Sequence, residues 1–130
     1  MEHFTRDLTL ANGLIVTFTS QSQRYFGDYY RVKLVIRTKT PVLAGYFDTP
    51  EEFAQACALL GEEVEYHREI EQMGIPSTEI ERAVTRIIDD FIAHSGSYFS
   101  ERDFPRKMVV AEFRRAINKQ SRSSVPRFQP

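Results

Sequence analysis

Basic side chains recur at nearly every second position of QRYFGDYYRVKLVIRTK, residues 23–39. Alternate side chains of an extended strand share one face, so Arg31, Lys33, Arg37 and Lys39 are expected to lie together. Such a row could contact phosphates, and aromatic rings beside it could stack on bases. However, the segment lacks the glycine and aromatic spacing of an RNA-recognition motif. We therefore favour a half-buried hairpin with a solvated basic face, and keep nucleic-acid contact as an alternative.

A second basic region lies toward the C-terminus. Arg114 and Arg115 begin it, and the sequence contains no acidic residue after Glu112. A basic segment of this kind could lie along phosphates or along an acidic protein surface. An ordinary solubilising terminus is the interpretation that we favour. Residues 119–130 are polar and without period, so we expect them to form a basic, disordered tail.

Acid–base or metal chemistry would depend on the few histidines of the chain. Asp90 and His94 have the i, i+4 spacing that places two ligands on one helical face. A metal site would need a further ligand, for which His67 or Glu69 is the available source. A histidine near a helix C-terminus is also favoured by the helix dipole, and this explanation needs no metal. We predict no metal, and note that a pocket between sheet and helices could use Tyr66, His67, Asp90 and His94.

Nucleophilic and nucleotide-dependent catalysis find no support in the sequence. Cys57 falls on the apolar face of an expected helix, where a thiol is buried and inert. The six glycines are scattered singly, so no phosphate-binding glycine-rich loop is formed. We therefore assign no catalytic residue and no cofactor.

The N-terminal third has the alternation of antiparallel strands. Leu8 and Leu10 precede the turn ANG, and Leu14, Val16 and Phe18 follow it. A three-residue loop, with Gly13 in the left-handed region, pairs Leu10 with Leu14 and puts all five apolar residues on one face. A second hairpin turns near FGDY and leads into a strand over 30–37. The sequence thus predicts at least three antiparallel strands within residues 5–40.

Three helices are expected, over residues 50–60, 78–95 and 104–118. Thr49 with Glu52, and Thr78 with Glu81, have the spacing of capping boxes. Gly61 and Gly96 are the expected ends of the first two helices. Residues 62–73 fit both strand and helix periodicity, and the absence of a capping residue after Gly61 favours a strand.

The composition is that of a globular protein. The chain has 130 residues, 42% of them hydrophobic, and a net charge of −1. Residues 51–90 carry eleven acidic and three basic residues, which suggests acidic and basic elements that neutralise each other or meet in a homodimer. The one cysteine excludes an internal disulfide, and no apolar run is long enough to span a bilayer. We expect a cytoplasmic location and no membrane association.

We predict an α+β protein in which an antiparallel sheet of three to four strands is packed on one face by about three helices. The expected order is β-β-β-α-(β)-α-α, with residues 1–118 forming a single domain. The favoured function is a non-catalytic interaction or regulatory module with a protein partner or a second copy of itself. The alternatives are a nucleic-acid-binding accessory protein, and a small enzyme or ligand-binding domain.

Overall fold

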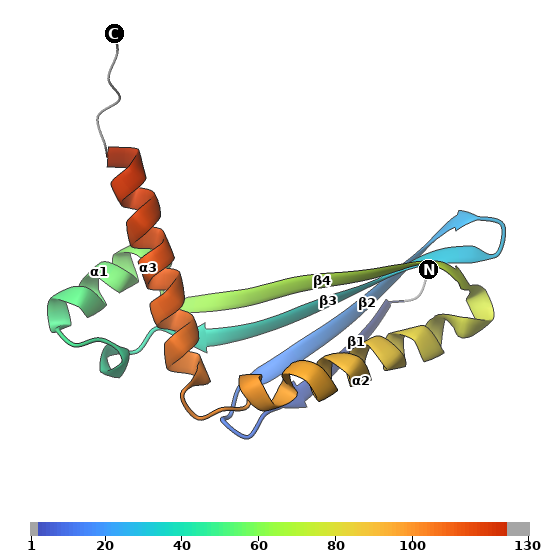
Figure 1. Cartoon of the computed structure of the whole chain (residues 1–130), viewed down its shortest axis with the longest axis horizontal. Helices are drawn as coiled ribbons and strands as arrows, with labels where there is room; N and C mark the ends of the chain where they lie inside the picture. The colour runs from blue at the N-terminus through green and yellow to red at the C-terminus, as the bar shows by residue number, and fades with distance from the viewer. Residues whose placement is uncertain (1–2, 125–130) are drawn as a thin grey trace, which may run out of the picture. The chain divides into compact units, whose positions relative to one another are not determined.

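The structure is a computed structural model, and it describes residues 3–124 of the chain. It contains one antiparallel sheet in the order β1-β2-β3-β4. The α+β class, the order of the elements and the strand within residues 62–73 are confirmed (Figure 1). The strands are β1 (His3–Thr9), β2 (Ile15–Phe26), β3 (Tyr29–Pro41) and β4 (Glu63–Pro76). The helices are α1 (Pro50–Leu60), α2 (Ile80–Phe99) and α3 (Phe104–Ser124), with 3₁₀ turns at Ala44–Tyr46 and Ser77–Glu79.

The chain divides into two compact units. The first contains the chain up to Lys39 together with Glu65–Arg102, and the second contains Thr40–Val64 and the chain from Asp103 onward. The sheet and α2 therefore dominate the first unit, whereas α1 and α3 belong to the second. Our expectation of a single domain over residues 1–118 stays a prediction.

Alternation along the strands builds the core of the first unit. Away from the second hairpin turn, the even-numbered residues of β2 and β3 are buried, and Phe18, Leu34 and Ile36 among them are fully buried. Phe18 meets Phe91 of α2 edge to face, with ring centroids 5.8 Å apart. We call the side of the sheet that faces α2 the inner face, and the opposite side the outer face. Odd-numbered residues of β2, β3 and β4 point to the outer face.

The first hairpin has the predicted three-residue loop. The Leu10 N–H donates to the Leu14 carbonyl at 2.8 Å, and Gly13 has a φ of 89°. The Asn12 side chain adds a contact that was not foreseen. Its Nδ2 donates to the carbonyls of Phe99 at 2.7 Å and Glu101 at 2.9 Å, at the C-terminal end of α2. The loop therefore caps a helix that begins almost seventy residues later in the chain.

The second hairpin is irregular near its turn. Arg24 pairs with Tyr30 but Phe26 pairs with Tyr29, so Tyr25 is an extra residue on β2 and forms a β-bulge. Gly27 has a φ of 54°, which a glycine adopts readily. The turn is also attached to the end of β4, because Ser77 N–H donates to the Asp28 carbonyl at 3.2 Å.

The boundaries of α2 differ from the prediction at both ends. A 3₁₀ turn precedes the helix, the N-cap is Glu79, and no side chain caps it, so the predicted cap at Thr78 is wrong. The helix also continues through Gly96 to Phe99. Phe99 is buried and its ring lies 5.4 Å from that of Phe91 and 4.9 Å from that of Tyr66. Burial of this ring outweighs the roughly 1 kcal/mol that a glycine costs inside a helix.

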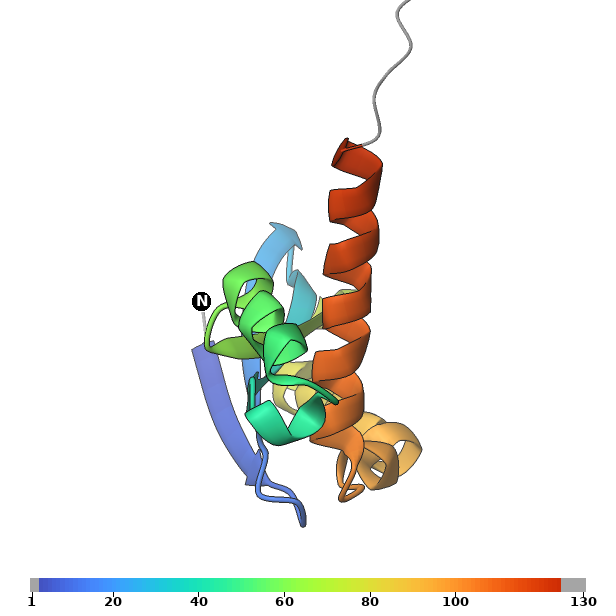
Figure 2. The same cartoon turned by 90° about the vertical axis from the view of Figure 1, so that its left-hand side faces the viewer.

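The second unit has its own core, in which α1 packs against α3 (Figure 2). Thr49 caps α1 as predicted, its Oγ1 accepting from the Glu52 N–H at 3.1 Å. Cys57, expected to be buried, is only partly so. The Phe47 ring meets that of Phe113 edge to face at 5.3 Å. The buried residues of this core are Val42, Ala56, Val64, Val109 and Phe113.

α3 is longer than expected. It continues past residue 118 to Ser124, so residues 119–124 are helical where we expected disorder. The remainder of the expected tail, residues 125–130, lies outside the described residues. None of the described helices is both long and apolar enough to cross a membrane.

Candidate functional site

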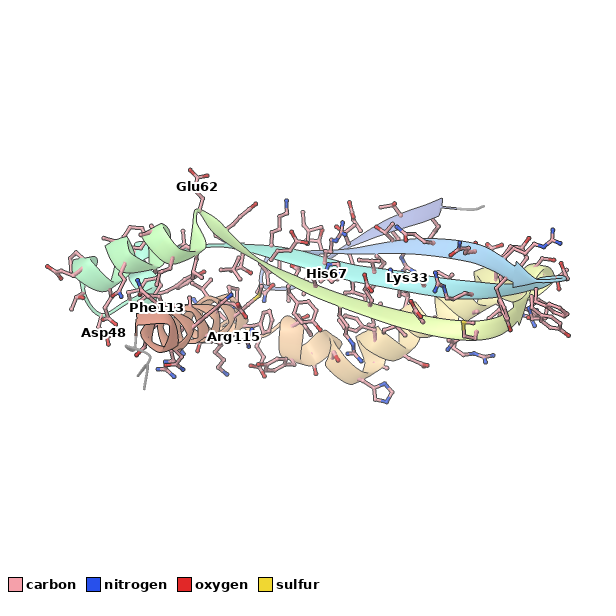
Figure 3. The ribbon with its side chains drawn as sticks, turned by 90° about the horizontal axis from the view of Figure 1, so that it is seen from above. Lys33, Asp48, Glu62, His67, Phe113 and Arg115 are labelled. Atoms are coloured by element: carbon pink, nitrogen blue, oxygen red, sulfur yellow. The ribbon has the colours of Figure 1, made fainter. Side chains whose placement is uncertain are left out.

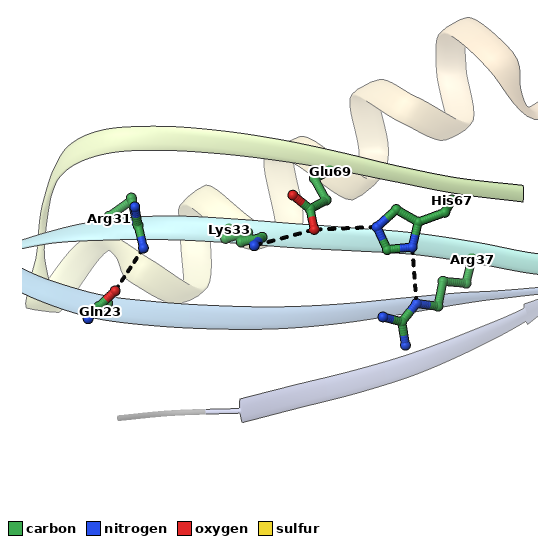
Figure 4. Close-up of polar contacts among 6 residues, drawn as sticks. All are labelled: Gln23, Arg31, Lys33, Arg37, His67 and Glu69. Carbon is green, nitrogen blue, oxygen red and sulfur yellow. Dashed lines mark hydrogen bonds and ion pairs between the residues drawn. The ribbon is translucent and has the colours of Figure 1, made fainter.

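A polar network crosses the outer face between β3 and β4 (Figure 4). Lys33 Nζ lies 3.3 Å from Glu69 Oε1, and Arg37 Nε lies 3.5 Å from Glu65 Oε1. His67 connects the two pairs, because its ring nitrogens lie 3.3 Å from Glu69 Oε1 and 3.3 Å from Arg37 Nε. The predicted basic row is thus matched by a row of glutamates on the neighbouring strand. The acidic and basic elements neutralise each other within the fold at these residues.

The hydrogen bonds of the network determine which ring nitrogen of neutral His67 carries the hydrogen. Arg37 Nε is always a donor, so His67 Nδ1 accepts, and the neutral ring carries its proton on Nε2 and donates it to Glu69. Hydrogen bonds from His67 and then from Lys33 hold the pKa of Glu69 below its ordinary value. Glu69 therefore stays ionised to a lower pH than an isolated glutamate.

The remaining predicted anion contacts are in different surroundings. Arg31 donates to the neutral amide of Gln23 at 2.8 Å, so an acidic group does not offset its charge there. Arg114 and Arg115 are exposed on α3 in the second unit, where Arg115 bonds to Glu112. Lys39 is exposed at the end of β3. Of the six predicted residues, the four on β3 lie on one surface of the first unit: Arg31, Lys33, Arg37 and Lys39. Lys33 and Arg37 face glutamates there.

The predicted pocket residues are not gathered in one cavity. Tyr66 and His67 are neighbours on β4 and so point to opposite faces of the sheet. Tyr66 packs on Phe99, whereas His67 joins the outer network. Asp90 and His94 do share a groove, and His94 Nδ1 lies 2.7 Å from the Asp90 carbonyl oxygen.

That groove runs between β4 and α2 and has a volume of about 200 Å³. Its floor is apolar and its rim polar, and it includes neither Tyr66 nor His67. The lining residues are Arg68, Ile70, Gln72, Ile87, Asp90, Phe91, His94 and Ser95. Sequence reasoning found Asp90 and His94 but missed Arg68 and Gln72, whose even numbering on β4 was the available signal for the inner face.

Large apolar side chains are exposed where β2, β3 and β4 end together. Phe26 is 73% exposed, and Tyr25, Tyr29 and Met73 are each about half exposed. Phe26 and Tyr29 are paired in register, and the Tyr25 hydroxyl lies 3.6 Å from the position of a Cβ at Gly74. We call Tyr25, Phe26, Tyr29 and Met73 the aromatic end. The sequence indicated the rings but not Met73, which lies next to Gly74 near the end of β4.

Metal ligation has no visible basis in the part of the chain that the structure describes. Within it, no group of three or more histidine, cysteine, aspartate or glutamate side chains is placed to hold a metal ion. Asp103 accepts hydrogen bonds from Arg106 at 2.6 and 2.8 Å, and this contact holds the pKa of Asp103 below its ordinary value.

The chain was compared with protein-family models, with curated proteins and with solved structures. None of them matches. The geometry of the outer face, the groove and the aromatic end is therefore what any assignment of function must be argued from.

Proposed function

We propose that the protein is a non-catalytic interaction module, and that the aromatic ends of two copies contact each other. The observation that carries the proposal is the exposure of Phe26, together with Tyr25, Tyr29 and Met73, at one end of the sheet. Aromatic residues and methionine are enriched where proteins meet. A second copy presents the same apolar patch, so a twofold contact is self-complementary in its chemistry. A different protein with an apolar surface would use the same side chains.

The surroundings of the aromatic end keep it ordered before binding. Phe26 and Tyr29 lie on paired strands, and the turn between them is bonded to the end of β4 through Asp28 and Ser77. Binding by a preorganised patch loses less side-chain and backbone entropy than binding by a loop. This supports a role of the aromatic end in association.

The size of the patch sets the expected strength of self-association. A fully covered aromatic side chain buries about 150–250 Å². Four side chains that are partly exposed supply less than the roughly 800 Å² per partner of a standard interface. The homodimer is therefore expected to form weakly, with a dissociation constant in the range from roughly 10 µM to 1 mM.

Nucleic-acid binding is the second candidate. It is favoured by the exposed rings beside Arg24 and Arg31, because stacking and a cation together bind single strands. It receives less support than protein contact, since Lys33 and Arg37 face glutamates and Asp28 adds a negative charge at the turn. Binding to a single-stranded oligonucleotide that weakens steeply with salt would favour this candidate.

The enzyme or ligand-binding alternative has the weakest support, because its four residues do not line a common pocket. A cytoplasmic location belongs to the proposal as well. Its basis is the single cysteine, since internal disulfides are typical of small secreted domains.

Sedimentation velocity over a range of concentrations tests the proposal. The double variant F26S/Y29S should remain monomeric at concentrations where the natural protein associates. Ile15→Ser is the matched control, because Ile15 is a lone exposed residue, 52% accessible, on the outer face of the same sheet. A natural protein that is monomeric up to about 1 mM, the weak limit of the expected range, would contradict the proposed homodimer.

A further inference from the structure

β4 is the last strand of the sheet in the order seen for the described residues 3–124. One of its edges pairs with β3, and Figure 3 looks down on the other edge, with α2 along the inner face. Every second residue of an edge strand directs its N–H and C=O groups away from the sheet. β4 has 14 residues, so its edge is long enough to pair with a whole further strand.

The groove described above lies next to this edge. Its floor is formed by Ile70 of β4 and by Ile87 and Phe91 of α2. A strand added to β4 would direct every second side chain to the inner face, beside these residues. The volume of about 200 Å³ suits one apolar side chain of such a strand. In strand addition, the backbone hydrogen bonds provide affinity, and a pocket for alternate side chains provides specificity.

The pairing of β4 with β3 shows which sequence pattern the outer face of β4 accepts. Lys33 and Arg37 of β3 stand beside Glu69 and Glu65, at 3.3 and 3.5 Å. Between these cations, the residues of β3 that point inward are apolar and buried. A strand on the other side of β4 meets the same glutamates, together with Glu71, which is exposed. Val35 stands between Lys33 and Arg37 on the outer face of β3, so the matching pattern is a cation at most outward positions and an apolar residue at the inward positions.

A second copy of β4 does not fit this edge. Twofold antiparallel pairing places outer-face residues opposite outer-face residues, because the pairing preserves the faces of the sheet. The odd-numbered residues of β4, on its outer face, are Glu63, Glu65, His67, Glu69, Glu71, Met73 and Ile75. Four of these seven are glutamates, and like charges directly opposite each other destabilise a strand pair.

We propose that the β4 edge binds an extended segment of another protein by strand addition, and that this segment alternates cationic and apolar residues. The cations lie over the glutamates of β4 on the outer face, and one apolar side chain enters the groove between Ile70, Ile87 and Phe91. This goes beyond the proposed homodimer, since it uses a different surface and a different partner.

A labelled heptapeptide of alternating lysine and valine, blocked at both ends, is the probe. Its binding is measured by fluorescence anisotropy at physiological ionic strength, with the natural protein and with F26S/Y29S, so that failure of the aromatic contact leaves this test intact. We expect equal binding to both proteins. N-methylation of the backbone along one edge of the peptide should weaken binding at least about tenfold, because it removes the hydrogen bonds of a strand pair.

Two variants locate the site. Glu71→Lys should weaken binding about two- to fivefold, the effect of one exposed charge pair, whereas Glu81→Lys, the same charge change on the solvent side of α2, should not. Ser95→Trp should fill the groove and weaken binding by a larger factor. Amide chemical shifts should change along residues 65–73 when the peptide is added.

Three results would overturn the proposal. The first is no binding at peptide concentrations up to about 1 mM. The second is equal binding of a peptide with the same composition but with its lysines and valines in separate blocks. The third is equal binding of the N-methylated peptide. The second or third result would show that the peptide binds by charge attraction alone, without pairing as a strand.

Discussion

Asn12 gives a sharp test of how the first hairpin and α2 depend on each other. Its amide donates two hydrogen bonds to the carbonyls of Phe99 and Glu101, and its Oδ1 accepts one from the Leu14 N–H at 3.1 Å. Asn12→Asp keeps the shape and the acceptor but removes both donors. It also places a negative charge against carbonyl oxygens at the negative end of the helix dipole.

The expected loss follows from these contacts. A typical hydrogen bond contributes about 0.5–1.5 kcal/mol net, and Asn12 is partly accessible to water, so Asn12→Ala should cost about 1–2 kcal/mol of unfolding free energy. Asn12→Asp loses only the two donated bonds, but it adds roughly 0.3–1 kcal/mol of unfavourable interaction with the helix dipole. It also adds the repulsion between the new carboxylate and the carbonyl oxygens of Phe99 and Glu101. We expect it to lose about 2–3 kcal/mol, more than the alanine variant.

Urea unfolding followed by circular dichroism measures both losses at neutral pH. The difference between the variants should shrink at a pH below the usual aspartate pKa of about 3.9, because the protonated carboxyl can donate one bond. If Asn12→Asp is at least as stable as Asn12→Ala at neutral pH, the Asn12 amide does not cap α2. The reasoning on the hairpin contact would then be refuted.

Three further outcomes are expected. Phe99→Ala should cost about 3–5 kcal/mol, as for a buried ring, whereas Tyr98→Ala, at an exposed neighbour, should cost clearly less in the same urea titration; similar losses would contradict the packing of Phe99. NMR titration should give Glu69 a pKa below its ordinary value of 4.5, and Lys33→Met should raise it. Because the folded-state pKa of Glu69 is lowered, its ionised form stabilises the fold at a pH above the ordinary pKa, and this stabilisation is lost as the pH falls through the folded-state pKa. A Glu69 pKa equal to the ordinary value would contradict the hydrogen bonds of the network. Gly13→Ala should cost about 1–2 kcal/mol, since its φ is 89°, and an unchanged unfolding midpoint would contradict the left-handed turn.

Local patterns were sufficient to predict the strands and their faces. The alternation from Leu8 to Phe18 required a three-residue loop, and the structure has it, because a register slip of one residue would turn the apolar side chains to water. The ends of α2 were not predictable in the same way. Gly96 is a frequent helix end, but burial of Phe99 against Tyr66, a residue from a distant segment, extends the helix past it.

The contacts on the outer face were likewise only partly predictable from the sequence. The sequence indicated a basic row on one strand and an excess of acidic residues over 51–90, and the interpretation that the acidic and basic elements neutralise each other was correct for Lys33 and Arg37. Which glutamate meets which cation depends on the pairing of β4 with β3, which no local pattern encodes. Val35 lies between Lys33 and Arg37 on the outer face and is only 3% exposed, because long side chains can cover a small residue between them.

The bulge at Tyr25 makes the tip of the second hairpin adjustable without disturbing the rest of the sheet. Gain or loss of one residue elsewhere in β2 would reverse the facing of Phe18 and its neighbours, and the core would be lost. At the bulge, the same change alters only the side to which the tip rings point. Descendants of this chain could therefore vary the contact surface at this one position while keeping the buried residues unchanged.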